Sequence, residues 1–462
     1  MIGDPAVIGL LYLVTIVCFV VALRFLSSPR LARKGNWVGG AGMLVAIGTT
    51  LAIEGIGNWA LIVVGLAVGS VVGVVGARTV KMTAMPQMVA LFNGVGGGAA
   101  ALIALAEFEH GVGVLGGVER VSRGLSALIG SVSFAGSIVA FAKLQELVSG
   151  RPIVFPGQNA VDGLVLAGAV GLGIALVAGV EETWVIWGLI ALALAFGVMV
   201  VLPIGGADMP VVIALLNALT GLAAAATGFV LSSTVLIVSG MLVGASGTFL
   251  TMLMARAMNR SLANVLFGAF GQVQAGVGAA VVDDGRTVRA TTPEDVAVML
   301  AYARRVVIVP GYGLAVAQAQ HDVRQLAELL EAKGVDVRYA IHPVAGRMPG
   351  HMNVLLAEAN VPYTQLHEMD EINPEFPQTD VALVIGANDV TNPAAREDAS
   401  SPIYGMPILD VDKAASVVVL KRSMNPGFAG IDNPLYLDPK TTMLFGDAKE
   451  SVSKLVAAVK GV

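Results

Sequence analysis

The stretch Val306-Val307-Ile308-Val309-Pro310-Gly311-Tyr312-Gly313 predicts the fold of the C-terminal part of this chain. Its run of β-branched residues is typical of a strand buried in a parallel sheet, and Gly-x-Gly follows directly. The first glycine permits a tight turn and the second lets a phosphate approach the backbone, so the stretch predicts a dinucleotide site. The third position of the usual motif is Val316 rather than glycine. A glycine-rich turn without a ligand therefore remains an alternative.

Strands and helices are expected to alternate through the rest of the C-terminal region. A helix should start at Thr292, which can cap it, because Pro293 and an acid at Asp295 follow. This alternation predicts a Rossmann-like domain with a doubly wound parallel sheet. The expected strands are Val306–Pro310, Val335–His342, Val381–Ile385 and Ser416–Leu420, with helices up to about Lys333 and from about Gly350.

The first half of the chain has the composition of a membrane protein. Hydrophobic residues make up 56% of the 462 residues and charged residues only 13%, against about 25% in ordinary globular chains. Stretches of about 18 to 22 apolar residues can cross a bilayer, and about nine occur. They are residues 6–26, 37–53, 59–76, 86–106, 124–142, 159–178, 184–202, 210–231 and 234–254. The expected organisation is a transmembrane domain at 1–255, a linker at 256–291 and a soluble domain at 292–462.

Charge predicts the orientation and excludes some classes of function. Lysine and arginine follow the first, third, fifth and ninth spans, whereas the other side has only Arg120 and Arg123, so the C-terminal domain should be cytoplasmic. The N-terminus lacks a basic segment and a cleavage site, and the first span should be retained. A net charge of −5 gives no indication of nucleic-acid binding, and a single cysteine, Cys18, excludes an internal disulfide or Cys-ligated metal site.

An internal repeat lies in the membrane region. The segment from Met85 to Asn93 matches the segment from Met209 to Asn217, and each has proline in the second position. Proline suits the first turn of a helix, and each asparagine would lie about two turns into the membrane. Two interpretations remain open: asparagines that hold helices together, or polar groups that line a hydrated path, because an intramembrane amide is costly unless satisfied.

Charged and glycine-rich loops follow the expected strands. Lys421-Arg422-Ser423 offers two cations and a hydroxyl where a strand ends, which suits a 2′-phosphate and favours NADP over NAD. A solvated basic turn is the alternative. The other loops are residues 344–350, 386–389, 425–430 and 446–448. Arg347 is a candidate to contact a phosphate, and Asp389 to titrate with nucleotide state, although either could cap a helix.

These motifs resemble those of the β subunits of proton-translocating nicotinamide nucleotide transhydrogenases. The similarity is carried by residues 311–320, 346–358, 386–389 and 421–424, by the membrane repeat, and by residues 131–137. It extends over nearly the whole chain. The resemblance implies hydride transfer between NADH and NADP⁺ coupled to proton entry, with NADP(H) on this chain. It further implies partner α subunits that bind NAD(H) and add membrane helices, in a dimer of heteromers within the lipid of the bacterial cytoplasmic (inner) membrane.

The loops and the resemblance together define a set of candidate site residues. NADP lies reversed in this family, which agrees with Lys421-Arg422-Ser423 at the 2′-phosphate, and residues 425–430 resemble a lid. Asp389 and Arg347 are the candidates for catalytic roles, and Asn93, Ser133, Ser137, Asp208 and Asn217 for the proton path. Cofactor contacts are expected from Gly311, Tyr312, Gly313, Val344, Ala345, Gly346, Arg347, Met348, Pro349, Gly386, Ala387, Asn388, Asp389, Val390, Lys421, Arg422, Ser423, Met424, Asn425, Pro426, Gly427, Phe428, Gly446, Asp447 and Ala448.

The sequence departs from this family at one membrane position. Some members carry a channel histidine where this chain has Asn93, and none of its five histidines lies within an expected span. A group that titrates near neutrality is thus absent there, and our hypothesis is that a partner helix supplies it. A different function also remains open: a transporter or channel whose nucleotide domain is only a sensor.

Overall fold

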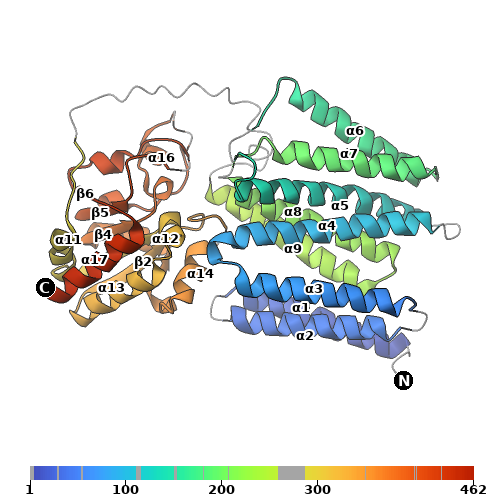
Figure 1. Cartoon of the computed structure of the whole chain (residues 1–462), viewed down its shortest axis with the longest axis horizontal. Coiled ribbons are helices and arrows are strands. Elements are labelled where there is room, and N and C mark those ends of the chain that lie inside the picture. Colours follow the sequence, from blue (N-terminus) through green and yellow to red (C-terminus); the bar gives the residue numbers. More distant parts are fainter. Residues whose placement is uncertain are drawn as a thin grey trace. The chain divides into compact units, whose positions relative to one another are not determined.

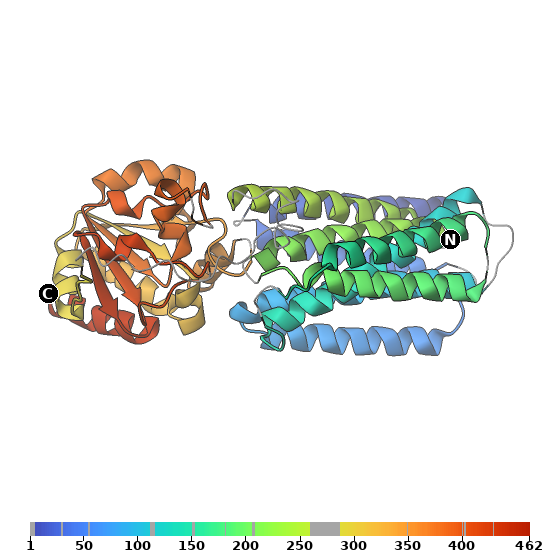
Figure 2. The same cartoon turned by 90° about the horizontal axis from the view of Figure 1, so that it is seen from above.

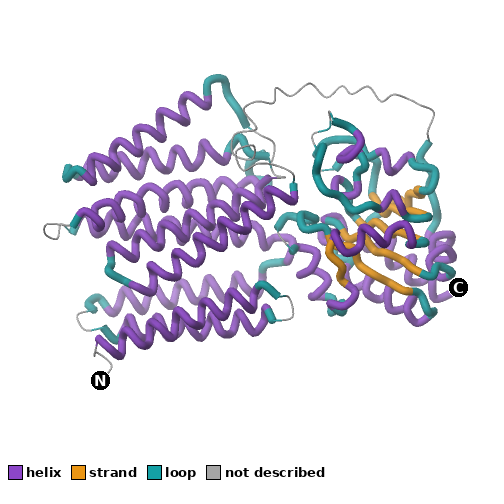
Figure 3. Tube along the Cα trace, turned by 180° about the vertical axis from the view of Figure 1, so that it is seen from behind, coloured by secondary structure: helices purple, strands orange, loops and turns teal. Residues whose placement is uncertain are grey.

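The computed structural model describes residues 5–28, 31–53, 56–110, 116–149, 153–180, 182–205, 208–258, 287–348, 350–399, 401, 403–427 and 429–462. The chain divides near Met252 into two compact units (Figure 1). The expected linker at 256–291 falls mostly outside the described residues. Within these residues the first unit is helical, and all strands belong to the second (Figure 3).

Nine long helices make up the first unit as far as the structure describes it. Eight of them are long and apolar enough to cross a membrane, and α2, which is rich in glycine, is the exception. The prediction of a polytopic membrane region is therefore confirmed. The helices are α1 (Pro5–Leu26), α2 (Ala32–Leu51), α3 (Trp59–Thr79), α4 (Met85–Glu109), α5 (Gly117–Leu144), α6 (Gln158–Val177), α7 (Thr183–Val201), α8 (Met209–Val230) and α9 (Thr234–Ala257).

The repeat forms two helices that meet a common partner. Helices α4 and α8 begin at Met85 and Met209, each with proline in its first turn as predicted, and both pack against α5. Glycines allow close packing: the backbone of Gly97 lies so near that of Gly130 that a Cβ on either would overlap the other helix. Small residues at such crossings are the usual means by which membrane helices approach one another.

Polar side chains hold the ends of these helices together. Lys143, near the end of α5, donates through Nζ to the carbonyl oxygens of Ile204 (2.9 Å) and Leu202, just beyond the end of α7. Gln87, in the first turn of α4, donates through Nε2 to the carbonyl oxygen of Leu144 at 3.1 Å. The last carbonyls of a helix have no intrahelical partner, so these bonds satisfy groups that burial would otherwise leave unpaired.

The second unit is built on a six-stranded parallel sheet. Its strand order, β3-β2-β1-β4-β5-β6, is that of a doubly wound Rossmann-like domain, which confirms the predicted fold. All four predicted strands are present, and two short edge strands, β3 and β6, were missed. The strands are β1 (Arg305–Pro310), β2 (Asp336–Ile341), β3 (Leu366–Glu368), β4 (Val381–Ile385), β5 (Ser416–Lys421) and β6 (Thr441–Phe445).

Helical segments lie on both faces of this sheet (Figure 2). The first starts at Pro293, and the Thr292 hydroxyl accepts from the Asp295 N–H at 3.2 Å, as the capping pattern predicted. The α-helices are α11 (Pro293–Ala301), α12 (Tyr312–Ala317), α13 (Gln320–Ala332), α14 (His351–Glu358), α15 (Met369–Ile372), α16 (Ala394–Glu397) and α17 (Ala448–Gly461). The 3-10 turns of this unit are η4 (Tyr363–Gln365), η5 (Asn373–Gln378), η6 (Asp389–Thr391), η7 (Val411–Lys413) and η8 (Pro434–Leu437), and η1 (Met82–Ala84) directly precedes α4 in the first unit.

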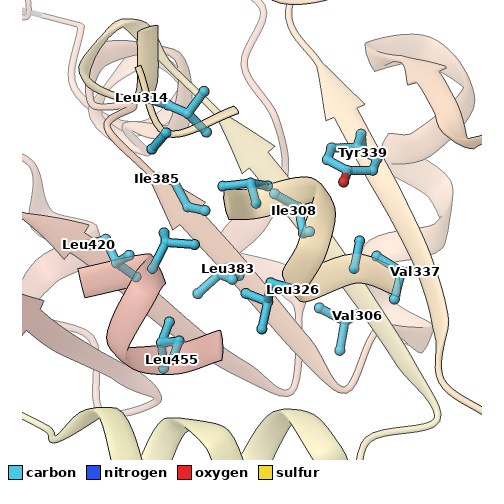
Figure 4. Packing of buried hydrophobic residues seen from close by; sticks show 14 of the residues in the cluster. Val306, Ile308, Leu314, Leu326, Val337, Tyr339, Leu383, Ile385, Leu420 and Leu455 are labelled. Carbon is cyan, nitrogen blue, oxygen red and sulfur yellow. The ribbon is translucent and has the colours of Figure 1, made fainter. Parts of the chain in front are cut away.

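The central strands are buried on both faces, which explains their continuous apolar sequence. Val306 and Ile308 of β1 pack with Leu326 of α13 and Leu455 of α17 in one buried cluster (Figure 4). The alternate residues, such as Val307, belong to a second cluster on the other face. Because both faces are covered, the sheet is a rigid support for the loops at the carboxyl ends of its strands.

Candidate functional site

The order of the strands reverses between β1 and β4, and a glycine-rich contact marks that point. The Gly311 N–H donates to the Ile385 carbonyl oxygen, and the Gly313 N–H to that of Gly386, both at 2.9 Å. Gly386 has φ +68°, and a Cβ there would lie 2.5 Å from the Gly313 Cα. The two loops thus touch backbone to backbone, and their glycines have no side chains that would hinder the approach of a phosphate.

A cleft of about 380 Å³ opens beside this contact, at the carboxyl ends of β1, β4, β5 and β6. We name it the switch-point cleft; its size falls in the range of small-molecule sites. Thirteen predicted residues line it: Gly313, Gly386, Ala387, Asn388, Lys421, Arg422, Ser423, Asn425, Pro426, Gly427, Gly446, Asp447 and Ala448. Val316, Ala317 and Leu420 also line it and were missed, although Val316 and Ala317 follow Gly313 at helical spacing and so could have been found.

Lys421 is the half-buried cation of this cleft. Its ammonium lies 4.8 Å from the centre of the Tyr436 ring, and burial lowers its pKa while Asp389 and Asp432 oppose that shift. The Asn388 amide, in the orientation that satisfies both its ends, accepts from Lys421 Nζ at 3.2 Å and from the Gly427 N–H at 2.6 Å. Arg422 and Ser423 are exposed at the rim. The cleft therefore combines an oriented cation with accessible hydrogen-bond donors.

Asp389 does not line the cleft, but it binds the segment that was predicted to be a lid. Its Oδ2 accepts from the Ala429 N–H at 2.9 Å, and a Cβ at Gly427 would lie 2.4 Å from the Asn388 amide and 2.7 Å from the Asp389 carboxylate. Phe428, between these two residues, lies outside the described residues. Asp389 thus joins the loop after β4 to the loop after β5.

Arg347 belongs to a second group at the ends of β1 and β2. Its guanidinium carbon lies 4.5 Å from the centre of the Tyr312 ring, a cation–π contact. Pro349 lies outside the described residues. The predicted residues that do not line the switch-point cleft are Gly311, Tyr312, Val344, Ala345, Gly346, Arg347, Met348, Asp389, Val390 and Met424.

The buried imidazole of His342, which begins the loop after β2, makes the domain sensitive to acid. Burial lowers its pKa from 6.5 to about 4, against the opposing effect of the Pro407 carbonyl. Below pH 6.5 the unfolded chain binds a proton that the folded domain does not, so stability falls until the pH reaches about 4. We expect His342 to account for a loss of about 3 kcal/mol between pH 7 and pH 4.

Hydrogen exchange of β2 in the intact chain, corrected for intrinsic rates, measures this loss. The His342→Asn variant keeps an acceptor near the Nδ1 position but does not titrate, so its stability should depend less on pH. Equal pH dependence in the two chains would refute the assignment.

A polar cluster joins α4, α5 and α8 in the membrane region. Asn93 Nδ2 donates to Ser137 Oγ at 2.9 Å and, more weakly, to Ser133 Oγ at 3.4 Å. Ser133 Oγ lies within hydrogen-bonding distance of Thr220 Oγ1 and of the Leu216 carbonyl oxygen. Three of the five predicted proton-path residues therefore meet in one buried cluster.

The other two proton-path candidates lie apart from these bonds. Asp208 is buried and immediately precedes α8. The Asn217 side chain has no hydrogen-bond partner among the described residues. Asp162 in α6 is a further buried carboxyl that was not among the predicted residues, and within the described part of the chain no donor reaches its Oδ1.

A helical membrane unit joined to a doubly wound domain with a basic, glycine-lined cleft defines a membrane protein with a nucleotide site. The family model described as NAD(P) transhydrogenase beta subunit matches residues 8–458. The NAD(P) transhydrogenase subunit beta of Rhodospirillum rubrum is 50% identical over 456 residues, covering 97% of this chain and 98% of that protein. A second sequence of that name, from strain ATCC 11170 of the same species, gives the same values. The chain therefore belongs to the NAD(P) transhydrogenase beta subunit family.

Proposed function

We propose that this chain binds NADP(H) in its C-terminal domain and acts with partner subunits that bind NAD(H). Together they would transfer hydride between the two nucleotides and move protons through the membrane helices. The observation that carries the choice of nucleotide is the switch-point cleft, where Lys421, Arg422 and Ser423 follow β5. A phosphate on the ribose would find charge-assisted donors there, whereas a bare hydroxyl would not use them.

The candidate residues divide into three roles toward the nucleotide. Gly313 and Gly386 would provide the bare backbone surface, and Lys421, Arg422 and Ser423 would hold the 2′-phosphate. The stacked pair of Arg347 and Tyr312 would contact the cofactor at the ends of β1 and β2. Bound NADP(H) supplies the hydride chemistry, and the protein supplies position and electrostatics. Val316, in place of the third motif glycine, agrees with a nucleotide bound in an unusual direction.

Asp389 is our candidate for communication between the nucleotide and the membrane. It binds the backbone of the lid at Ala429 and acts electrostatically on Lys421. A change in lid position would therefore alter the surroundings of this carboxylate. If protonation favours one arrangement of the domain, the redox state of the nucleotide must change proton affinity reciprocally.

The proton path would follow the interface of α4, α5 and α8. Asn93, Ser133 and Ser137 form its hydrogen-bonded centre, with Asp208 and Asn217 along α8. Amides and hydroxyls can relay a proton through water but do not titrate near neutrality, so a partner helix near Asn93 would supply a histidine or acid.

The location of the chain follows from the same proposal. Arginines and lysines after α1, α3, α5 and α9 favour a cytoplasmic nucleotide domain, and the apolar helices would lie in the lipid of the bacterial inner membrane. We propose a dimer of heteromers, each containing this chain and its NAD-binding partners.

Nucleotide selectivity of the chain alone tests the proposal. The purified full-length chain in detergent should bind NADP⁺ and NADPH at least about 100-fold more tightly than NAD⁺, because each charge-assisted bond contributes roughly 1.5 to 3 kcal/mol. Isothermal titration calorimetry measures the three affinities. Equal affinity for NAD⁺ and NADP⁺ would contradict the assignment of this nucleotide to this subunit.

A further inference from the structure

Arg347 lies in the loop between β2 and α14, and a buried histidine lies at each end of this loop. The Val344 N–H donates to Nδ1 of His342 at 3.2 Å, and the Arg347 N–H donates to Nδ1 of His351 at 3.0 Å. Both imidazoles are almost fully buried. Each ring thus accepts a hydrogen bond from the loop backbone at the same nitrogen.

His351 lies directly against the loop that it binds. Gly346 has φ +108°, and a Cβ at that residue would lie 2.5 Å from His351 Nδ1 and 2.7 Å from Cγ. Only glycine leaves room for the ring and also adopts this backbone angle readily. His351 is the first residue of α14, so the helix presents its imidazole back to the loop.

His351 also adjoins the stacked pair that the loop presents. The ring centres of His351 and Tyr312 lie 6.1 Å apart at an interplanar angle of 60°. Tyr312 in turn lies under the Arg347 guanidinium. The imidazole therefore contacts both members of the pair, one through its ring and the other through the Arg347 backbone.

We propose that His351 is a positioning residue for nucleotide binding: its Nδ1 fixes the Arg347 backbone so that the guanidinium stays stacked on Tyr312. This inference rests on the proposed function, in which that pair contacts the cofactor. His351 itself touches no reacting atom.

The hydrogen bonds define which nitrogen carries the proton. A nitrogen that accepts an N–H carries none, so neutral His351 is protonated at Nε2. Burial and the nearby Arg347 charge lower the pKa of His351, which favours this neutral form. Nε2 of His342 donates to the Pro407 carbonyl oxygen at 2.8 Å, whereas within the described part of the chain Nε2 of His351 has no partner. The position of the loop therefore depends on Nδ1 of His351 and not on its Nε2.

Two amide substitutions separate the nitrogens. His351→Asn places an oxygen near the Nδ1 position, whereas His351→Gln places its amide near the Nε2 position. In calorimetry with the purified full-length chain, we expect NADP⁺ and NADPH affinity to fall about tenfold in His351→Gln, because the half-buried Arg347 N–H loses its acceptor. The affinity of His351→Asn should stay within about threefold of the original chain. Trypsin cleavage after Arg347 should accelerate only in His351→Gln.

Nuclear magnetic resonance gives a readout on the unaltered chain, with His351→Asn used only to assign the resonances. With ¹⁵N-labelled histidine in the full-length chain, the imidazole resonances that disappear in His351→Asn should show a ring protonated at Nε2. A proton on Nδ1 would overturn the proposal, as would undiminished affinity in His351→Gln or an equal loss in His351→Asn. Failure of the unaltered chain to bind NADP⁺ or NADPH would instead refute the proposed function, and the position of the proton would remain a separate result.

Discussion

Replacing Lys421 by methionine is expected to weaken NADP⁺ binding about 10- to 100-fold and to leave the weak binding of NAD⁺ nearly unchanged. The ammonium is oriented by Asn388 and the Tyr436 ring, so a phosphate would meet a cation whose position is already fixed. Its partial burial makes the interaction stronger than one at a fully solvated site. Methionine keeps most of the volume and removes the charge, and the loss should therefore be specific to the phosphorylated nucleotide.

Lys460→Met provides a matched control for Lys421→Met. Lys460 lies in the last turn of α17, whereas the first residue of that helix, Ala448, lines the cleft. This variant removes the same charge from the domain and should bind NADP⁺ normally. A similar loss for NADP⁺ and NAD⁺ in Lys421→Met would place the lysine somewhere other than at the 2′-phosphate.

Replacing Gly386 by alanine should abolish measurable NADP⁺ binding and destabilise the C-terminal domain by about 3 kcal/mol or more. Its φ of +68° is unfavourable for alanine, and the added Cβ would lie 2.5 Å from both Gly313 Cα and Leu314 N. Both of those atoms belong to backbone, so no side chain can rotate away. The loops after β1 and β4 would have to separate, and the cleft depends on the contact between them.

Gly334→Ala isolates the steric part of this effect. Gly334 has φ +88°, yet no atom lies within 4 Å of the position a Cβ would occupy. Its substitution carries the conformational cost of about 1 to 2 kcal/mol without the clash, and it should leave nucleotide affinity intact. Hydrogen exchange of β4 and calorimetry with NADP⁺ compare the two variants. Normal nucleotide binding by Gly386→Ala would show that the contact between the loops is not needed for the site.

The sequence predicted those parts of the fold that local pattern determines. Strands β1 and β4 are apolar throughout because both of their faces are covered, and Thr292 caps α11 by a bond between residues three apart. The edge strand β3 has three residues and begins with Leu366-His367, too short a stretch to show any periodicity. The helix expected from Tyr312 to about Lys333 is divided at Gln318, whose φ of +51° no local motif indicated.

Which residues belong to the candidate site was easier to predict than which of them contact one another. Loops after parallel strands meet at one edge, so most residues of the switch-point cleft could be named in advance. The lid contact of Asp389 and the packing of His351 against Gly346 depend on which loop backbones touch, and that depends on the packing of the whole domain. In the membrane region the bond from Asn93 to Ser137 joins residues 44 apart in sequence, a separation across which no periodicity carries information.

Sealed vesicles that contain this chain with its NAD-binding partner subunits test the central claim of coupling most directly. NADH and NADP⁺ would be supplied on the side of the nucleotide domain, a pH difference imposed across the membrane, and the final NADPH to NADP⁺ ratio measured. If one proton crosses for each hydride, every pH unit should shift the equilibrium about tenfold, toward NADPH when protons enter on that side, because one unit corresponds to about 1.4 kcal/mol. A final ratio independent of the imposed pH difference would contradict the account.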